Sequence, residues 1–302
     1  MTEWFESDES WYPAKWGPDD QLGTLNVLGP DSVLAAARLI RHGHVYRLGH
    51  EIFHGMPTKD DAHGPFGYFV TTRPHDDRGA ERSASRNKFG ATHCRLEMVD
   101  HLGTHIDALN HIAFDNRFYN GVDAYAEITA EGVRKLGMET FPPIVTRGVL
   151  VDVAGLHGVD VLDRGYAITV DDVESCLAGD GLDVRPGDVV VFHTGVSASW
   201  DDPGRRDGYF DSPPGIGYAV GKWLAERDVA AVGADSPATE VMPSELPDTY
   251  LPVHQYLIVK HGIRILDNLK LDELAAARAH EFAFVCAPLP LRGATGSPVN
   301  PL

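Results

Sequence analysis

Short runs of apolar residues, rich in Val, Ile and Phe, recur at intervals along much of the chain. Runs of this length, bounded by polar or turn-forming residues, are typical of buried β-strands. One further segment, at 92–99, alternates apolar and polar residues, which also favours a strand. The predicted strands span residues 92–99, 144–153, 188–193, 229–233, 263–266 and 281–288.

Helical patterns lie between these runs, and their ends carry recognisable start and stop signals. In the first predicted helix, Asp31 is the expected N-cap and Gly43 the stop. Thr169 or Asp171 could cap the second, and Gly262 follows the fourth where a C-terminal glycine is expected. The predicted helices span residues 31–41, 170–177, 216–227, 253–260 and 271–280.

The alternation of strands and helices predicts an α/β layer structure. No linker divides the chain cleanly, so residues 31–302 are predicted to form a single domain. Residues 1–30, rich in Trp, Pro, Gly and Asp, are predicted to be an irregular N-terminal arm. The loop-rich stretch at 55–90 is long enough to be functional, as a lid or as a subunit contact.

Charge and cysteine content narrow the choice of partners and compartment. The formal net charge is -18, and an acidic surface repels phosphate backbones, so nucleic acid is not an expected partner. Cys94, Cys176 and Cys286 lie far apart and are odd in number, which favours a reducing cytoplasm over a disulfide framework. The N-terminus lacks the pattern of a signal peptide. No apolar run approaches the roughly 20 residues needed to cross a bilayer, so no membrane association is expected.

One segment concentrates residues that can bind a metal. Residues 100–111, DHLGTHIDALNH, contain three histidines and two aspartates. Neutral imidazole and carboxylate are the usual protein ligands of zinc and manganese. Gly103 lets the backbone bend so that His101 and His105 can point at one centre. Asp107 lies two residues beyond His105, a spacing that places both side chains on the same side of an extended segment. His101, His105 and Asp107 are therefore predicted to be metal ligands.

Three protein ligands with open positions are what a catalytic metal needs. Such a metal can lower the pKa of a water molecule from about 15.7 toward about 7. His111, four residues beyond Asp107, is predicted to stay off the metal and transfer a proton, since an ordinary imidazole titrates near neutral pH. A single histidine is more often a surface residue or a satisfied core residue. Three histidines at this spacing with an intervening Asp favour the metal site instead.

The run His-x-Gly-Thr-His-x-Asp-x-x-x-His at 101–111 resembles the signature of the cyclase-like metal hydrolases, the superfamily of bacterial kynurenine formamidase and isatin hydrolase. The stretches WGPDDQLGTLN at 16–26, FHGMP at 53–57 and FHTG at 192–195 are also similar to longer members. The likeness extends from about residue 16 to about residue 290. Leu109 stands where the signature normally has Pro, so the loop that carries His111 is expected to be less rigid.

This resemblance implies a swivelling β/β/α fold, assembly as a homodimer or homotetramer, and hydrolysis of a carbon–nitrogen or ester bond. It matches His101, His105 and Asp107 to metal ligands and His111 to the proton donor or acceptor. The substrate would be a small molecule and the cofactor a divalent metal ion, zinc or manganese.

The superfamily also has a His and a Glu about a dozen residues apart, which complete a site for one or two metals. His254 and Asp267 fall at the matching places. Asp267 is one methylene shorter than the family's Glu, so its contact with the metal is expected to be indirect or weak. Taken without the resemblance, His254 is equally well interpreted as a surface residue and Asp267 as part of a turn.

Two further histidines, His54 and His193, are candidate substrate-binding residues, although packing at a strand end would also explain His193. The predicted activity is hydrolysis of an amide, a cyclic amide or a lactone. The alternatives are a non-hydrolytic cyclisation or dehydration, and a metal-binding relative without turnover. No Gly-x-Ser-x-Gly elbow, Walker loop or Gly-x-Gly-x-x-Gly follows a strand, so serine-hydrolase, NTPase and dinucleotide functions lack support.

Overall fold

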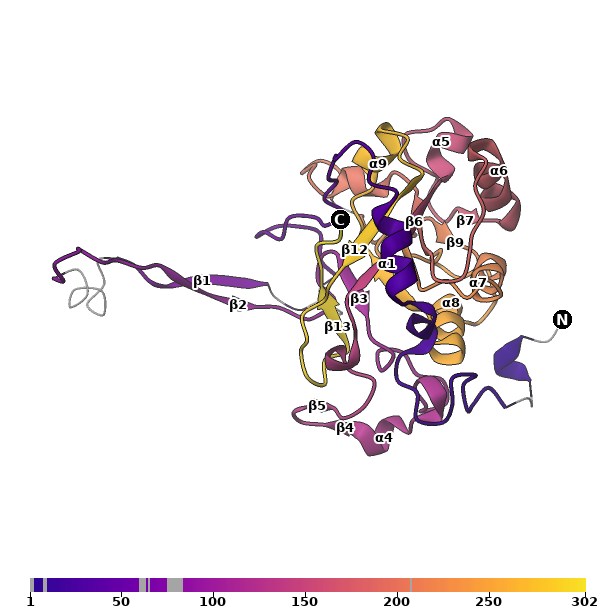
Figure 1. Cartoon of the computed structure of the whole chain (residues 1–302), viewed down its shortest axis with the longest axis horizontal. Coiled ribbons are helices and arrows are strands. Elements are labelled where there is room, and N and C mark those ends of the chain that lie inside the picture. The colour runs from indigo at the N-terminus through magenta and orange to yellow at the C-terminus, as the bar shows by residue number, and fades with distance from the viewer. Residues whose placement is uncertain (1–2, 8–9, 60–63, 65, 75–83, 207) are drawn as a thin grey trace.

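The computed structural model describes residues 3–7, 10–59, 64, 66–74, 84–206 and 208–302. Within them, the largest sheet has seven strands in the order β12-β6-β8-β10-β11-β3-β13 (Figure 1). The four central strands β6, β8, β10 and β11 run parallel, and β12, β3 and β13 pair antiparallel to their neighbours. These strands are β3 (His105–Asp107), β6 (Ile144–Asp152), β8 (Val189–His193), β10 (Ala231–Ala234), β11 (Arg264–Asp267), β12 (Glu281–Cys286) and β13 (Gly296–Pro298).

Helices cover both faces of this sheet. On one face α6 and α7 pack against a core that includes Val149 and Val151, and on the other α1 and α9 lie over a core that includes Leu150. Because both faces are buried, the central strands are continuous apolar runs, as is typical of parallel strands. The helices are α1 (Pro30–Ala37), α4 (Ala124–Glu127), α5 (Val153–His157), α6 (Val170–Asp180), α7 (Tyr218–Ala225), α8 (Pro252–His254) and α9 (Asp272–Ala276).

The structure confirms the α/β layer architecture and the predicted strands, with small changes at their ends. It corrects some helix boundaries. α1 begins at Pro30 with Gly29 as N-cap, so Asp31 lies inside the first turn, and it ends well before Gly43. Of the two candidate caps for α6, Thr169 is the one that accepts a hydrogen bond, from the amide of Asp172. Among the described helices, none combines the length and the apolar content that crossing a membrane requires.

The helix predicted at 253–260 consists of two parts. α8 ends at His254, and a π-helical turn, η6 (Gln255–His261), continues from it. Gly262 then adopts a left-handed conformation and ends the segment, as predicted. π-Helical turns of this kind occur frequently at functional sites, and here the turn begins next to a candidate metal ligand.

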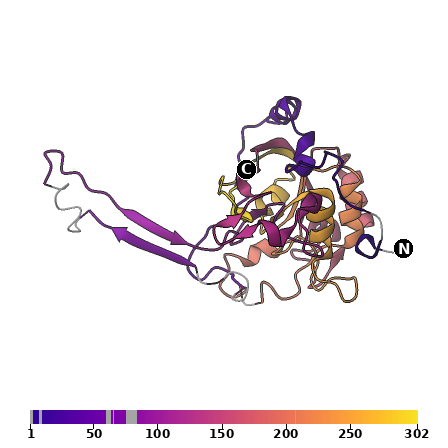
Figure 2. The ribbon, with the colours of Figure 1, turned by 90° about the horizontal axis from the view of Figure 1, so that it is seen from below.

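A long antiparallel hairpin projects from the body of the molecule (Figures 1 and 2). Its strands are β1 (Gly67–Thr72) and β2 (His93–Glu97), and all five residues of β2 are exposed. β1 lies within the stretch 55–90 that was predicted to be loop, so that prediction is wrong for 67–72. Residues 60–63, 65 and 75–83 of the stretch lie outside the described residues.

Two short ribbons, β4 (Ile128–Thr129) with β5 (Gly132–Val133) and β7 (Ala167–Ile168) with β9 (Gly215–Ile216), complete the described strands.

The described residues before α1 are irregular apart from two short 3-10 turns, η1 (Trp4–Glu6) and η2 (Gly23–Val27). They are also packed against the body. Trp4 is buried against the rings of Phe114 and Tyr256, and Leu25 belongs to the core on the α1 face of the sheet. Three more 3-10 turns lie in the part of the chain that the structure describes: η3 (Tyr119–Gly121), η4 (Met138–Thr140) and η5 (Val196–Ser199).

Candidate active site

The short strand β3 places two candidate ligands on one side of the sheet. His105 and Asp107 are its first and last residues, so both side chains point to the same face, as their spacing predicts. The neighbouring strand β11 ends at Asp267, which lies directly opposite His105 in the register. β13 closes the other side, with Gly296 opposite Asp107. Sheet pairing thus brings a carboxylate from near the end of the chain to the predicted metal-binding segment.

Segments outside the sheet add three histidines around these strands. His101 precedes β3, and Gly103, with φ of +69°, makes the bend between them. His111 follows β3, and its ring stacks on that of His101 with 3.9 Å between the ring centroids. His254, the last residue of α8, is 3% exposed. It is therefore not a surface residue, and Asp267, 5% exposed at a strand end, is not a solvent-facing turn.

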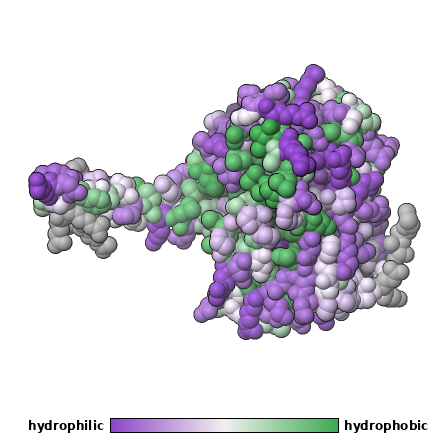
Figure 3. Space-filling model, viewed as in Figure 1, coloured by the Kyte–Doolittle hydropathy of each residue, from purple (hydrophilic) through white to green (hydrophobic). Residues whose placement is uncertain are grey.

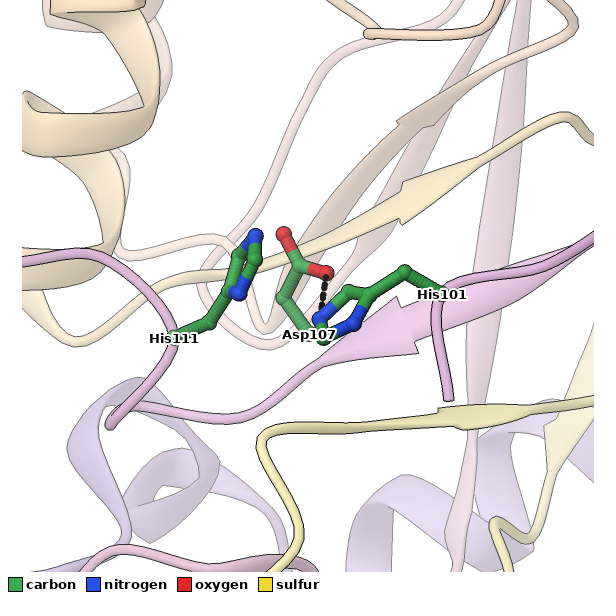
Figure 4. A group of neighbouring side chains, drawn as sticks. All are labelled: His101, Asp107 and His111. Atoms are coloured by element: carbon green, nitrogen blue, oxygen red, sulfur yellow. Dashed lines mark ion pairs between the residues drawn. The ribbon is translucent and has the colours of Figure 1, made fainter. Parts of the chain in front are cut away.

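The facing atoms form two groups that share Asp107. One contains His101, Asp107 and His111, and the other contains Asp107, His254 and Asp267; within each group the potential ligand atoms lie within 4.8 Å of one another. Figure 4 shows the first group, with the carboxylate of Asp107 beside the two stacked rings. Its Oδ1 is 3.5 Å from Nε2 of His101, and its Oδ2 is 3.9 Å from Nε2 of His254. Asp107 can thus reach two neighbouring positions at once.

His105 lies beside both groups. Its Nε2 is 3.7 Å from Oδ1 of Asp107 and 3.6 Å from Oδ2 of Asp267. The latter oxygen is also 3.7 Å from Nε2 of His254. The structure therefore brings together all six residues for which sequence analysis expected a metal-binding or proton-transfer role: His101, His105, Asp107, His111, His254 and Asp267.

Three of the histidines have their Nδ1 atoms bonded to acceptors. His101 donates to Asp100 at 2.9 Å, His105 to the carbonyl of Gly103 at 2.9 Å, and His254 to Glu240 at 2.5 Å. A carbonyl or ionised carboxylate can only accept, so each Nδ1 carries the hydrogen. Each Nε2 then faces the cluster. Orienting contacts of this kind are typical of metal-binding histidines.

The cluster has unsatisfied polar atoms where a cation would be expected. Both oxygens of Asp107 and Nε2 of His101 are buried and have no hydrogen-bond partner among the described residues. A buried carboxylate without such partners costs free energy, which a bound cation would offset. A Cβ at Gly296 would lie 2.6 Å from Nε2 of His101, so only glycine leaves this atom free. The residues present fit a divalent metal.

Burial and neighbouring charge shift the pKa values of the cluster in opposite directions. Burial, together with the nearby Asp267, raises the pKa of Asp107 to about 7. Burial alone would also raise the pKa of Asp267, but His254 beside it lowers that pKa below the usual value. Burial and the neighbouring His101 hold the pKa of His111 well below its usual value. His111 is therefore a neutral imidazole near pH 7, able to accept a proton.

The cluster forms one wall of a cavity of about 300 Å³. Lys59 contributes a cationic side chain to the lining, and most of the remaining lining is apolar or aromatic. A cavity of this size and composition suits a small molecule with an apolar body. The lining residues outside the cluster and Asp100 are Lys59, Val99, Phe210, Pro213, Pro237, Ala238, Met242, Tyr250 and Leu251.

The two histidines predicted to bind substrate do not line this cavity. His54 is exposed on a loop, with its ring against Phe66. His193 ends β8, and its Nδ1 is bonded to Asp152 at 2.7 Å. This carboxylate is the main reason that the pKa of His193 rises to about 9, although burial opposes the shift. The structure therefore gives His193 an ion-pairing position at the strand end and gives the substrate-binding hypothesis no support for either residue.

Sequence analysis assigned no role to Asp100, Thr239, Glu240 or Gly296. Asp100 is adjacent to the metal-binding motif, so its position was a usable signal. Thr239 and Glu240 reach the cluster only through tertiary contacts with Asp267 and His254. Gly296 reaches it only through the pairing of β13 with β3. For these three residues the local sequence contains no sign of the role.

Comparisons with known proteins agree with this architecture. Residues 46–241 match the family described as "Putative cyclase". A crystal structure of a novel cyclase superposes with a TM-score of 0.85 at 35% identity, covering 95% of each chain. Kynurenine formamidase of Bacillus thuringiensis (strain Al Hakam) is 26% identical over 244 residues, which are 80% of this chain and 94% of that protein. Isatin hydrolase A from Labrenzia aggregata, bound to benzyl benzoate, has the same fold, with a TM-score of 0.62 at 19% identity over 85% of this chain and 91% of that one. The family match covers well over half of the chain and the first structural match nearly all of it, and the chain therefore belongs to the cyclase family.

Proposed function

We propose that this protein is a metal-dependent hydrolase that cleaves an amide, a cyclic amide or a lactone in a small molecule. The observation that carries the proposal is the pair of ligand groups sharing Asp107, whose buried oxygens lack hydrogen-bond partners. The cluster lies in a cavity of suitable size, so substrate can reach it. Relatives named kynurenine formamidase and isatin hydrolase support an amide or cyclic amide as the reacting group.

In this proposal two neighbouring metal positions share Asp107. His101 and Asp107 hold the one beside His111, His254 and Asp267 complete the other, and His105 lies beside both. When bound there, a divalent metal supplies Lewis-acid polarisation of the scissile carbonyl and lowers the pKa of water. His111 is neutral and lies at the cavity wall, so it accepts the proton of the attacking water. It then donates that proton to the departing nitrogen or oxygen. The apolar walls hold the body of the substrate and exclude bulk water.

The donor atoms suit either zinc or manganese, because imidazole nitrogen and carboxylate oxygen bind both. Two groups sharing one carboxylate favour two metals in each chain. Cys94, Cys176 and Cys286 are all free, which fits the reducing cytoplasm expected from the sequence.

The test combines metal content with isotope incorporation. Wild-type protein purified without chelators should contain close to two equivalents of zinc or manganese per chain. It should hydrolyse an N-formyl arylamine or isatin, with one oxygen from ¹⁸O-labelled water in the product. His105→Ala should lose metal and activity together. Turnover without ¹⁸O incorporation would instead identify a cyclase or dehydratase, and metal without turnover of any amide or lactone a non-enzymatic relative.

His111→Ala separates proton transfer from metal binding. The variant should retain most of its metal and lose about 10²–10⁴-fold in rate, the range usual for a general acid or base. The grouping of His111 with His101 and Asp107 makes ligation the competing role. A metal-depleted His111→Ala protein would assign His111 to the ligands.

We also propose that the protein assembles with further copies of itself, as a homodimer or homotetramer. In the projecting hairpin, Tyr68 pairs with Leu96 and Val70 with Cys94, so these four residues share one face of the ribbon. All four are exposed. A two-stranded hairpin is at best marginally stable alone in water, so an apolar face of this kind needs a cover. Figure 3 shows a second apolar area on the body near α1 and β12, where Leu34, Ile40 and Val45 are exposed.

A further inference from the structure

The segment Thr239–Glu240 lies behind the cluster, away from the cavity lining, and both residues are almost completely buried. It contacts two of the proposed metal ligands, one through each side chain. Neither residue lies in the run at 101–111 that resembles the family signature, and both side chains are engaged with proposed ligands rather than with the cavity. The contacts of Thr239 and Glu240 therefore affect how the proposed ligands Asp267 and His254 are oriented.

Glu240 is 1% exposed, and both oxygens of its carboxylate accept hydrogen bonds from the segment that carries His254. Oε1 accepts hydrogen bonds from the amide of His254 at 2.8 Å and from its Nδ1 at 2.5 Å, and Oε2 accepts one from the amide of Val253 at 3.1 Å. The Nδ1 contact fixes both the tautomer and the rotation of the imidazole. Nε2 is thereby held facing Asp107 and Asp267, with its lone pair available when a metal binds.

Thr239 performs the equivalent task for Asp267. Its hydroxyl is 2.6 Å from Oδ1 of Asp267 and 3.0 Å from the carbonyl of Leu266. A hydroxyl has a single hydrogen to donate, and the carboxylate is the closer and the stronger acceptor. This contact occupies Oδ1 and leaves Oδ2, the oxygen that faces His105 and His254, free for a cation. Thr239 thus holds in one orientation the carboxylate of Asp267, whose side chain is one methylene shorter than that of the family's Glu.

The backbone of this segment is itself rigidly held. Thr239 has φ of +49°, a left-handed conformation that is rare and costly for a β-branched residue. It is maintained by hydrogen bonds between the segment and β9: the amide of Ile216 donates to the carbonyl of Thr239, and the amide of Val241 to the carbonyl of Ile216. A Cβ on Gly215 would lie 2.4 Å from the carbonyl carbon of Glu240, so the two backbones are in direct contact.

We propose that Thr239 and Glu240 are a pair of positioning residues that pre-align Asp267 and His254 for one of the two metal positions, the one shared by Asp107, His254 and Asp267. This inference rests on the proposed metal-dependent function. It predicts that loss of either contact weakens that position while the position between His101, Asp107 and His111 keeps its metal. Partners of this kind typically contribute about 10–100-fold to metal affinity.

The experiment measures Co²⁺ and Zn²⁺ binding to metal-free protein by chelator competition, with the Co²⁺ absorption bands as a report of ligand geometry. Glu240→Gln and Thr239→Val should bind the weaker equivalent about 10–100-fold less tightly and alter its Co²⁺ spectrum. Thr239→Ser keeps the hydroxyl and should bind as wild type does. Glu245→Gln is the matched control, because Glu245 caps the amide of Tyr218 and does not contact the cluster.

Thermal unfolding of each metal-free variant shows whether it folds. If Glu240→Gln fails to fold, the Thr239→Val and Thr239→Ser pair decides, since Val keeps the shape of Thr without the hydroxyl and Ser keeps the hydroxyl without the methyl. Wild-type affinity and spectra in both Glu240→Gln and Thr239→Val would overturn the proposal. Equal losses in Thr239→Ser or Glu245→Gln would overturn it too, by showing general destabilisation. Wild-type protein that binds no metal would overturn both this proposal and the proposed function.

Discussion

At the scale of single residues, Asp107 is subject to opposing demands from folding and from metal binding. Its carboxylate is buried without a hydrogen-bond partner among the described residues, which is favourable only when a cation is near. Burial raises its pKa from 3.8 to about 7, so folding of the metal-free chain takes up a proton between these values. Protonation of Asp107 therefore stabilises the metal-free fold, fully below about pH 4, and this stabilisation is lost as the pH rises through 7.

Asp107→Asn should accordingly make the metal-free protein more stable while removing metal from both positions. The stabilisation should be small near pH 4 and grow to a few kcal/mol at pH 8, since each unit of pKa difference corresponds to about 1.4 kcal/mol. Urea unfolding in the presence of a chelator, at several pH values, measures it. A variant that is less stable than wild type at pH 8 would show that the buried carboxylate is compensated by other groups.

His193, which does not line the cavity of the cluster, makes a pH-dependent contribution in the same direction as Asp107 but at higher pH. Asp152, Asp235 and Asp272 all raise its pKa, against the effect of burial, from 6.5 to about 9. A raised pKa of a base stabilises the fold below pH 6.5, and this stabilisation disappears as the pH rises through 9. His193→Gln should lower the free energy of unfolding by on the order of 3 kcal/mol at pH 6 and have little effect at pH 10. A loss that is the same at both pH values would exclude the ion pair as its cause.

At the scale of secondary-structure elements, β13 brings a glycine against the proposed ligand His101. Replacing Gly296 by Ala puts a Cβ 2.6 Å from Nε2 of His101, so this ring must move. Metal binding at the position between His101, Asp107 and His111 should weaken by at least about tenfold, comparable to the loss of an orienting contact. The position that depends on Glu240 should be affected less.

Gly179→Ala provides the control for this substitution. Gly179 lies within α6, and a Cβ there meets no atom within 4 Å. Removing a helical glycine should stabilise the protein by about 0.5–1 kcal/mol and leave metal binding unchanged. Metal titrations of the two alanine variants that give the same curve would contradict the role assigned to Gly296.

These elements also show what can be predicted from the sequence and what cannot. The central strands are buried on both faces, so their sequences alone predict them. β1, GYFVTT, has the aromatic and β-branched residues of a strand, but it is mostly exposed and lies inside a stretch rich in Gly, Pro and charged residues that as a whole resembles a loop. The proposed ligands of 101–111 are close in sequence and form a local motif, whereas Glu240 reaches His254 from a separate segment. Its function depends on a tertiary contact that local sequence does not encode.

At the scale of the whole molecule, the exposed apolar face of the projecting hairpin is difficult to account for in a protein that remains monomeric. If its apolar face packs on another copy, wild-type protein should elute as a dimer or tetramer with a molar mass, measured by light scattering, that is a multiple of 32.9 kDa. Leu96→Asp places a charge on that face and should shift the protein toward monomer. Arg95→Gln makes the same change in net charge on the opposite face and should leave the assembly intact. A monomeric wild-type protein would show that the hairpin has another role.

The pairing of β3 with β11 and β13 also determines when the site can exist during synthesis. Gly296, the partner of Asp107, is made roughly 190 residues later, and at about 5–20 residues per second that interval lasts about 10–40 s on the ribosome. Through most of this time the His101–His111 segment has left the ribosome with neither neighbouring strand available to it. The proposed metal site therefore becomes complete only after β13 has been translated and can pair with β3.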